Sequence, residues 1–288
     1  MVWKYKKIIK EIVFYSVCLI VAFCCLFPFY WAVVSSFRDS SNLFSTELLP
    51  SKITFDNYKE VFSDVTFGCS FLNSGVVAVC TALLTLAVCL FAAYPLARAK
   101  FRGKKRFLMA ALGVTTLPHV AVLSGLFELI RFLDIYNEKS ALILSYMIIT
   151  VPFTLWTLTN FMRNIPKEIE EAAIMDGASR YEILTKVFLP ILKPAIVTTG
   201  LLAFIAAWNE FLFALTFTLT NQSRTVPVSL ALFSGASQHE LPWGLIMAAS
   251  VLVTLPLIVL VVVFQRKIVA GLTAGAIKGY SFFLMVKS

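Results

Sequence analysis

The feature that most constrains this chain is a series of apolar runs, each about 20 residues long. An α-helix rises about 1.5 Å per residue, so about 20 residues cross the ~30 Å hydrocarbon core of a bilayer. Of the 288 residues, 59% are hydrophobic and only 14% are charged, which is far more apolar than a water-soluble domain. We predict six membrane spans: residues 12–34, 71–97, 107–130, 140–162, 195–218 and 243–264.

These runs predict an all-α fold, because a helix satisfies every backbone polar group of a segment that lies in lipid. A membrane β-barrel would instead show short segments of alternating hydrophobicity. We therefore expect one polytopic transmembrane domain over residues 1–288, with six transmembrane helices, a cytoplasmic loop at 164–194 and a tail at 265–288.

The positive charges alternate from loop to loop. Of the 25 Lys and Arg residues, 19 fall in the N-terminus, the second and fourth loops and the C-terminus, and 6 fall in the other three loops. Positive charge is enriched on the cytoplasmic side of membrane proteins, so both termini are predicted to be cytoplasmic. This distribution accounts for the net charge of +9, and no nucleic-acid partner is expected.

The fourth loop, 164–194, predicts two short helices joined at Gly177. Asn164 is the expected cap of the first helix. Gly177 supplies the left-handed residue with which many helices end. Ser179 and Glu182 have the spacing of a capping box, which marks the start of the second helix. The loop therefore predicts an amphipathic helix–turn–helix on the cytoplasmic side, whose second helix carries an apolar stripe of Tyr181, Leu184, Val187 and Phe188.

This loop also carries a spaced motif. Three residues separate Glu171-Ala172-Ala173 from Gly177, and nine residues separate Gly177 from Val187-Phe188-Leu189-Pro190. The pattern resembles the EAA loop of ABC-importer permeases, with Val187 at a position where the family pattern has Ile. The loop also lies before the last two spans, as it does in that family.

Further segments resemble the carbohydrate-uptake branch of these permeases, in particular its maltose-type "G" subunits. They are Trp208-Asn209-Glu210-Phe211, Thr225-Val226-Pro227 and the tail 269–279. The resemblance implies a subunit of an importer in the bacterial cell membrane. This chain would form half of the path for a di- or oligosaccharide such as maltose or trehalose.

The resemblance also implies a set of partners. They are a second (F-type) permease subunit, two cytoplasmic ABC ATPase subunits and an extracytoplasmic solute-binding protein. The sequence contains no Gly-x-x-x-x-Gly-Lys-Ser/Thr phosphate loop, so ATP and Mg²⁺ are expected on the ATPase subunits. No cofactor, metal site or enzymatic activity is expected on this chain itself.

By resemblance, four groups of residues are candidates for function. The ATPase-coupling residues are Glu170, Glu171, Ala172, Ala173, Met175, Asp176, Gly177 and Ala178. Gly275 and Lys278 in the tail are expected to contact the ATPase, and Asn221, Gln222 and Arg224 the binding protein.

The fourth group is Trp208, Asn209, Glu210 and His119, candidates for the translocation path. Polar residues inside a span are functional candidates by default. A structural role remains open for each: an interhelical hydrogen bond for Asn209 and Glu210, and packing for His119 and Trp208.

Three other classes of protein compete with this interpretation. An intramembrane enzyme would need a catalytic set such as His-Glu-x-x-His, which the sequence lacks. A secondary transporter would usually carry inverted repeats and ion-coupling acids at mid-membrane. No convincing repeat is evident, and the cytoplasmic helix–turn–helix would lack a purpose. An ABC permease for a non-sugar solute, such as a glycerol phosphodiester or a polyamine, stays open as the alternative.

Overall fold

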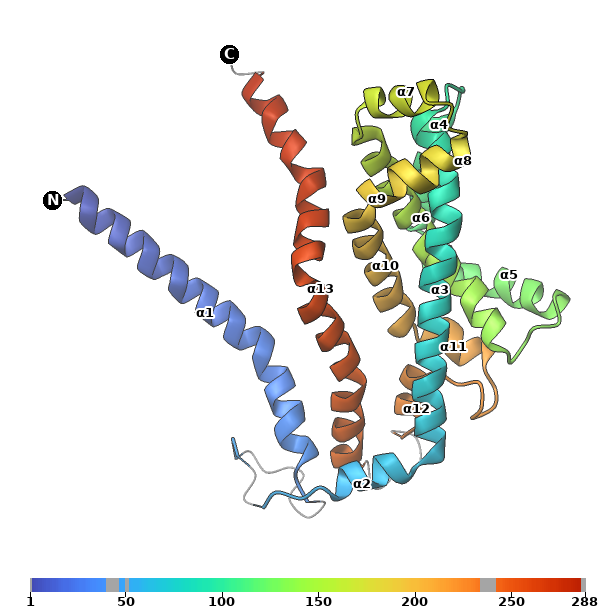
Figure 1. The fold of residues 1–288 in the computed structure, drawn as a ribbon. Coiled ribbons are helices and arrows are strands. Elements are labelled where there is room, and N and C mark those ends of the chain that lie inside the picture. Colours follow the sequence, from blue (N-terminus) through green and yellow to red (C-terminus); the bar gives the residue numbers. More distant parts are fainter. Residues whose placement is uncertain (1, 40–46, 50–51, 234–241, 286–288) are drawn as a thin grey trace. The chain divides into compact units, whose positions relative to one another are not determined.

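The computed structural model describes residues 2–39, 47–49, 52–233 and 242–285, and describes side chains between residues 8 and 267. Every regular element in these ranges is a helix, which confirms the all-α prediction. Its contacts divide the chain into two units, 1–68 with 230–256 and 69–229 with 257–288. The helices are labelled in Figure 1.

Four helices are long and apolar enough to cross a membrane by themselves. They are α1 (Val2–Ser36), α3 (Val65–Arg98), α6 (Lys139–Asn164) and α13 (Trp243–Met285). Two further spans are possible only as bent pairs, so the described residues hold four to six candidate membrane helices.

The first bent pair falls in the third predicted span. Helix α4 (Lys104–Val114) meets α5 (His119–Phe132) at 98°. At this break the hydroxyls of Thr115 and Thr116 donate to the carbonyls of Leu112 and Gly113, each at 2.7 Å. Both carbonyls also accept from backbone amides, Leu112 from that of Thr115 and Gly113 from that of Thr116, so each hydroxyl adds a second hydrogen bond at the end of α4.

The second bent pair adjoins the fifth predicted span. The segment Arg180–Ile191 comprises α8 (Arg180–Glu182), the π-helix η2 (Ile183–Phe188) and α9 (Leu189–Ile191), and it meets α10 (Lys193–Trp208) at 81°. After a break at Asn209, α11 (Leu212–Phe217) follows. Helix α12 (Val226–Phe233) lies beyond the next loop.

The first unit connects the end of α1 to α2 (Asp56–Ser63). The side-chain amide of Asn57 donates to the carbonyls of Ser36 and Arg38, both at 2.9 Å. The Ser36 and Tyr58 hydroxyls are 2.7 Å apart. Gly244 of α13 leaves room for Asn57, since a Cβ there would lie 2.6 Å from the Asn57 amide nitrogen.

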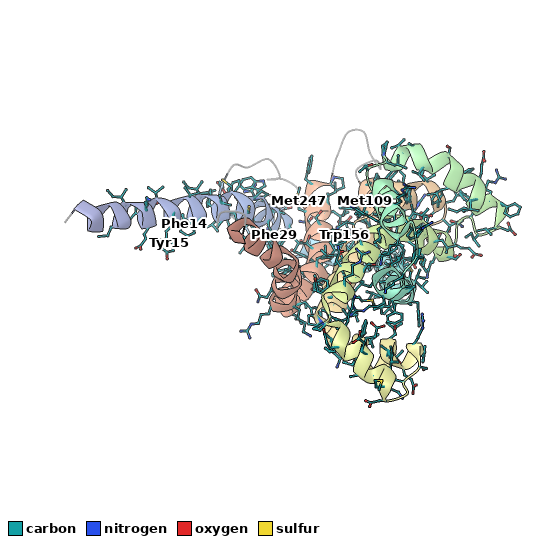
Figure 2. All side chains as sticks on the ribbon, turned by 90° about the horizontal axis from the view of Figure 1, so that it is seen from above. Phe14, Tyr15, Phe29, Met109, Trp156 and Met247 are labelled. Atoms are coloured by element: carbon teal, nitrogen blue, oxygen red, sulfur yellow. The ribbon has the colours of Figure 1, made fainter. Side chains whose placement is uncertain are left out.

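Most of α1, in the first unit, is exposed. Its membrane-length window is 0% buried, and the Phe14 and Tyr15 rings, 63% and 69% exposed, project from the helix in Figure 2. A face this apolar is stable only against lipid or another subunit.

The second unit packs α3, α6 and α10 around a hydrophobic core near one end of α3 (Figure 1). Cys89 and Ala93 of α3, Leu158 of α6, and Ile183 and Phe188 of η2 are fully buried there. Hydrogen bonds also join these helices, such as the 2.7 Å bond between the Thr85 and Thr150 hydroxyls. Hydrogen bonds between helices matter here because the hydrophobic effect drives little association of apolar helix faces in lipid.

We expect Gly244→Val to destabilise the first unit. The new side chain would displace Asn57 and break its bonds to α1, at a cost of about 1–3 kcal/mol. Thermal unfolding of the purified protein measures this as a lower midpoint. Gly68→Val is the control, because a Cβ at Gly68 meets nothing within 4 Å. Equal midpoints for the two variants would contradict the role of Asn57.

Candidate functional site

The predicted helix–turn–helix is present in the structure. Helix α7 (Lys167–Met175) ends at Asp176, and Gly177 follows with φ of +81°. The amide of Gly177 donates to the Ile174 carbonyl and the amide of Ala178 to the Ala173 carbonyl, both at 3.0 Å. This pair of bonds is the Schellman arrangement, which confirms the predicted left-handed role of Gly177.

The start of α7 differs from the prediction. Asn164 does not cap this helix, because it is the last residue of α6, and Pro166 occupies the N-cap position. A proline at this point lacks an amide hydrogen, so it leaves no unsatisfied donor. The acidic side chains of Glu168 and Glu170 lie in the first turn, where the helix dipole favours negative charge.

The second arm starts with the predicted capping box. The Ser179 hydroxyl accepts from the Glu182 amide at 3.3 Å, and the Glu182 carboxylate accepts from the Ser179 amide at 3.0 Å. The Lys186 ammonium, and then the Ser179 amide and hydroxyl, lower the pKa of Glu182 to about 2. The cap therefore stays charged at physiological pH, and its contribution fades only as the pH falls from about 4 towards 2.

The π-helix η2 changes the face that the second arm buries. Ile183 and Phe188, five residues apart, are both fully buried, whereas Tyr181 is 65% exposed. In a π-helix, residues five apart stack along one face. The predicted apolar stripe from Tyr181 to Phe188 is therefore shifted, and Ile183 takes the place that Tyr181 was expected to have.

The coupling residues predicted on this hairpin divide into two groups. Glu171, Ala172, Met175, Asp176 and Gly177 are exposed, with Met175 at 87%. Glu170, Ala173 and Ala178 are half-buried, and both alanines pack against the hydrophobic core of the second unit. One side of α7 is therefore available to a partner, and the other side faces the transmembrane helices.

The residues predicted for the translocation path lie around the break between α10 and α11. The Glu210 carboxylate accepts from the amides of Phe213 at 2.8 Å and Ala214 at 3.1 Å, so it caps the start of α11. Trp208 is 3% exposed, and its ring lies against Phe71 and Phe204.

Asn209 and His119 are exposed. The Asn209 side-chain amide donates to the Ile205 carbonyl at 3.0 Å. The His119 ring lies 5.9 Å from that of Phe213, beside the Glu210 cap. Of the four residues, these two present polar groups at the surface of the chain.

The loop from Leu219 to Thr225 is fastened by residues that the sequence did not single out. The Asn137 side-chain oxygen accepts from the amides of Leu219 and Thr220, at 2.7 and 3.0 Å, and from the Ser223 hydroxyl at 2.5 Å. Asn137 holds φ of +66°, a left-handed conformation that asparagine tolerates.

A second asparagine holds the same loop from α3. The Asn73 side-chain amide donates to the carbonyls of Gln222 at 2.7 Å and Arg224 at 3.0 Å. An asparagine inside an apolar run is a signal that could have identified Asn73. Asn221, predicted to contact a binding protein, accepts from the Arg224 guanidinium at 2.5 Å on the outer surface of the loop.

Gly275 and Lys278 fall in the last part of α13, where side chains lie outside the described residues. Within the described ranges, no three His, Cys, Asp or Glu side chains gather closely enough to hold a metal ion.

The helical bundle, with its broken helices and projecting hairpin, defines an integral membrane component of a transport system. Among solved structures, the fold is similar to a chain from a bacterial ABC transporter that imports the acidic polysaccharide alginate. The TM-score is 0.80 at 25% identity, covering 90% of this chain and 96% of that one.

Residues 85–273 match the family described as binding-protein-dependent transport system inner membrane component, and the chain belongs to this family. It is 41% identical to the trehalose/maltose transport permease MalG of Thermococcus litoralis, over 95% of this chain and 99% of the relative. It is 39% identical to the trehalose transport permease SugB of Mycobacterium tuberculosis, over 88% and 93%.

A third relative, at 38% identity, is the sulfoquinovosyl glycerol transport permease SmoH of Agrobacterium fabrum, over 88% of this chain and 89% of the relative. The matches confirm the resemblance seen in the EAA loop. They also exclude the secondary-transporter alternative, because the family is a component of binding-protein-dependent systems.

We expect Asn137→Gly to loosen the loop that follows α11. Glycine keeps the left-handed backbone, so the variant removes the side-chain acceptor without adding strain. Hydrogen exchange at the amides of Leu219 and Thr220 should rise about tenfold, since each loses its partner. Asn137→Asp retains the acceptor and serves as the control. Unchanged exchange in Asn137→Gly would show that other contacts hold the loop.

Proposed function

We propose that this chain is one of two permease subunits that line the path of an ATP-driven sugar importer. The observation that carries the proposal is the hairpin at Gly177, in which Glu171 and Met175 are exposed on one side of α7. A short helix exposed in this way has the form of a docking element. Its other side packs on the transmembrane core, so a force applied to α7 would reach the spans.

In this proposal the hairpin is cytoplasmic and docks on an ABC ATPase subunit, in agreement with the bias of Lys and Arg towards alternate loops. The chain carries no phosphate loop, so ATP and Mg²⁺ bind to two ATPase subunits, which supply all the chemistry. The C-terminal residues Gly275 and Lys278 are assigned to the same ATPase contact.

A second permease subunit of the F type completes the path. It also supplies a surface for the apolar face of α1, which this chain leaves uncovered. On the opposite side of the membrane, the loop of Asn221, Gln222 and Arg224 contacts a solute-binding protein. A related solved structure, at 14% identity, is described as a complex with a periplasmic protein that holds an alginate pentasaccharide.

The solute that we propose is a di- or oligosaccharide such as trehalose or maltose. Support comes from the names of the relatives, which include permeases for trehalose, maltose and diacetylchitobiose. Asn209 and His119, which are exposed beside the helix break, are candidates to line the path for hydroxyl groups.

An anionic sugar conjugate is the second candidate, because one relative carries sulfoquinovosyl glycerol. Recognition of an anion favours Arg side chains in the path. The predicted spans hold no Lys or Arg in their interiors, so a neutral sugar fits this chain better.

Affinity purification in mild detergent tests the docking role. We expect the wild-type chain to bring with it a second permease and an ATPase, and Gly177→Arg to lose the ATPase. A side chain at φ of +81° both strains the turn and obstructs the docking surface.

Gly103→Arg is the matched control, because Gly103 also has a positive φ, of +94°, and open space around it. This variant imposes the same kind of strain at a different turn, and it should retain the ATPase. An ATPase that stays bound to Gly177→Arg would contradict docking at this hairpin.

ATP hydrolysis by the complex, reconstituted with its cognate binding protein, tests the solute. We expect trehalose, maltose or a longer oligosaccharide to stimulate hydrolysis several-fold. Stimulation by a glycerol phosphodiester, a polyamine or sulfoquinovosyl glycerol, with none by neutral sugars, would overturn the sugar assignment.

A further inference from the structure

The carboxylate of Glu170 is held between α7 and α3. Its Oε2 lies 2.9 Å from the Nε of Arg98, and its Oε1 accepts a 2.8 Å hydrogen bond from the Tyr94 hydroxyl. The two charged side chains are only 14% and 9% exposed. The next residue, Glu171, is exposed, because neighbouring side chains on a helix point about 100° apart.

Arg98 joins more than these two helices. Its Nη2 donates to the carbonyl of Ile165 at 2.7 Å, directly after the end of α6. Its guanidinium also lies 5.1 Å from the centre of the Phe188 ring in η2. One side chain from the end of α3 therefore contacts the end of α6, the first turns of α7 and the second arm of the hairpin.

Besides these polar contacts, α7 reaches the hydrophobic core through the half-buried Ala173. Helix α7 has no fully buried side chain. A cavity of about 650 Å³ lies beside the ion pair, and its lining includes Phe91 and Pro95 of α3, Ile174 of α7, and Tyr181. Beside this cavity, the contacts of Glu170 with Tyr94 and Arg98 join α7 directly to α3.

We propose that Glu170 and Arg98 form a clamp that makes α7 move together with α3 and α6. This inference rests on the proposed docking of the hairpin. It gives two adjacent residues different roles. Glu171 belongs to the surface that docks on the ATPase, and Glu170 attaches that surface to the spans. Both members of the clamp are positioning residues.

An ion pair suits this role because its two members are costly to separate. A carboxylate that leaves its guanidinium here exposes two unpaired charges to a poorly solvated site. The pair thus resists separation of α7 from α3 while the adjoining cavity leaves the hairpin room to tilt.

The test uses the complete complex in proteoliposomes, with the double variant Arg98→Met and Glu170→Met. Removing both charges leaves no unpaired charge buried, and proteins in which a buried pair is replaced in this way often retain their fold. We expect the ATPase to remain bound, and sugar transported per ATP hydrolysed to fall about tenfold. The control is Asp56→Met with Lys59→Met, which removes an exposed ion pair of α2 and should change neither quantity.

A complex that assembles and transports with wild-type efficiency would overturn the clamp. Loss of the ATPase from the double variant would also overturn it, because Glu170 would then belong to the docking surface. Tyr94→Phe is the milder variant if the double variant fails to fold. It removes one hydrogen bond to Glu170 and no charge, and it should reduce transport per ATP by a smaller factor; an unchanged value would count against the clamp.

Failure of the clamp can be distinguished from failure of the proposed docking function. If the hairpin is not the docking element, Gly177→Arg retains the ATPase whatever the clamp variants do. If docking holds and the clamp does not, Gly177→Arg loses the ATPase while the Arg98 and Glu170 double variant transports normally.

Discussion

Inside the hydrocarbon core of a bilayer, a backbone amide or carbonyl without a partner costs several kcal/mol. That cost explains why the spans are helical, and it also explains what lies at the breaks within them. Between α10 and α11, the Glu210 carboxylate accepts from two amides of the new helix. Between α4 and α5, threonine hydroxyls donate second hydrogen bonds to two of the last carbonyls of α4. At both of these breaks, the side chains that bond to the backbone lie close to the break in sequence.

The same constraint gives structural roles to two residues that the sequence offers for the transport path. Glu210 is the only acidic residue inside the fifth predicted span, and its geometry is that of a helix cap. Trp208 packs between two aromatic rings. Exposed polar groups at this level come from Asn209 and His119.

Different kinds of contact hold the two ends of the second unit. At the hairpin end, a hydrophobic core and the Glu170–Arg98 pair attach α7 to the spans. At the other end, Asn137 and Asn73 fasten the Leu219–Thr225 loop through hydrogen bonds to its backbone. Backbone bonds of this kind fix the path of a loop and leave its outer side chains open to a partner.

The sequence by itself determined the all-helical class, the EAA spacing, the turn at Gly177 and the capping box at Ser179. All of these depend on residues near one another in the chain, so local periodicity and turn chemistry reveal them. The same reasoning failed for the start of α7 and for the buried face of η2, because a proline cap and a π-helical turn both depart from standard α-helical spacing. Only the tertiary structure decided that Arg98, which the charge count treated as one more cytoplasmic base, is paired with Glu170, and that Asn137 holds a distant loop. Such contacts join segments separated by whole spans, and the packing of the helices alone brings them together.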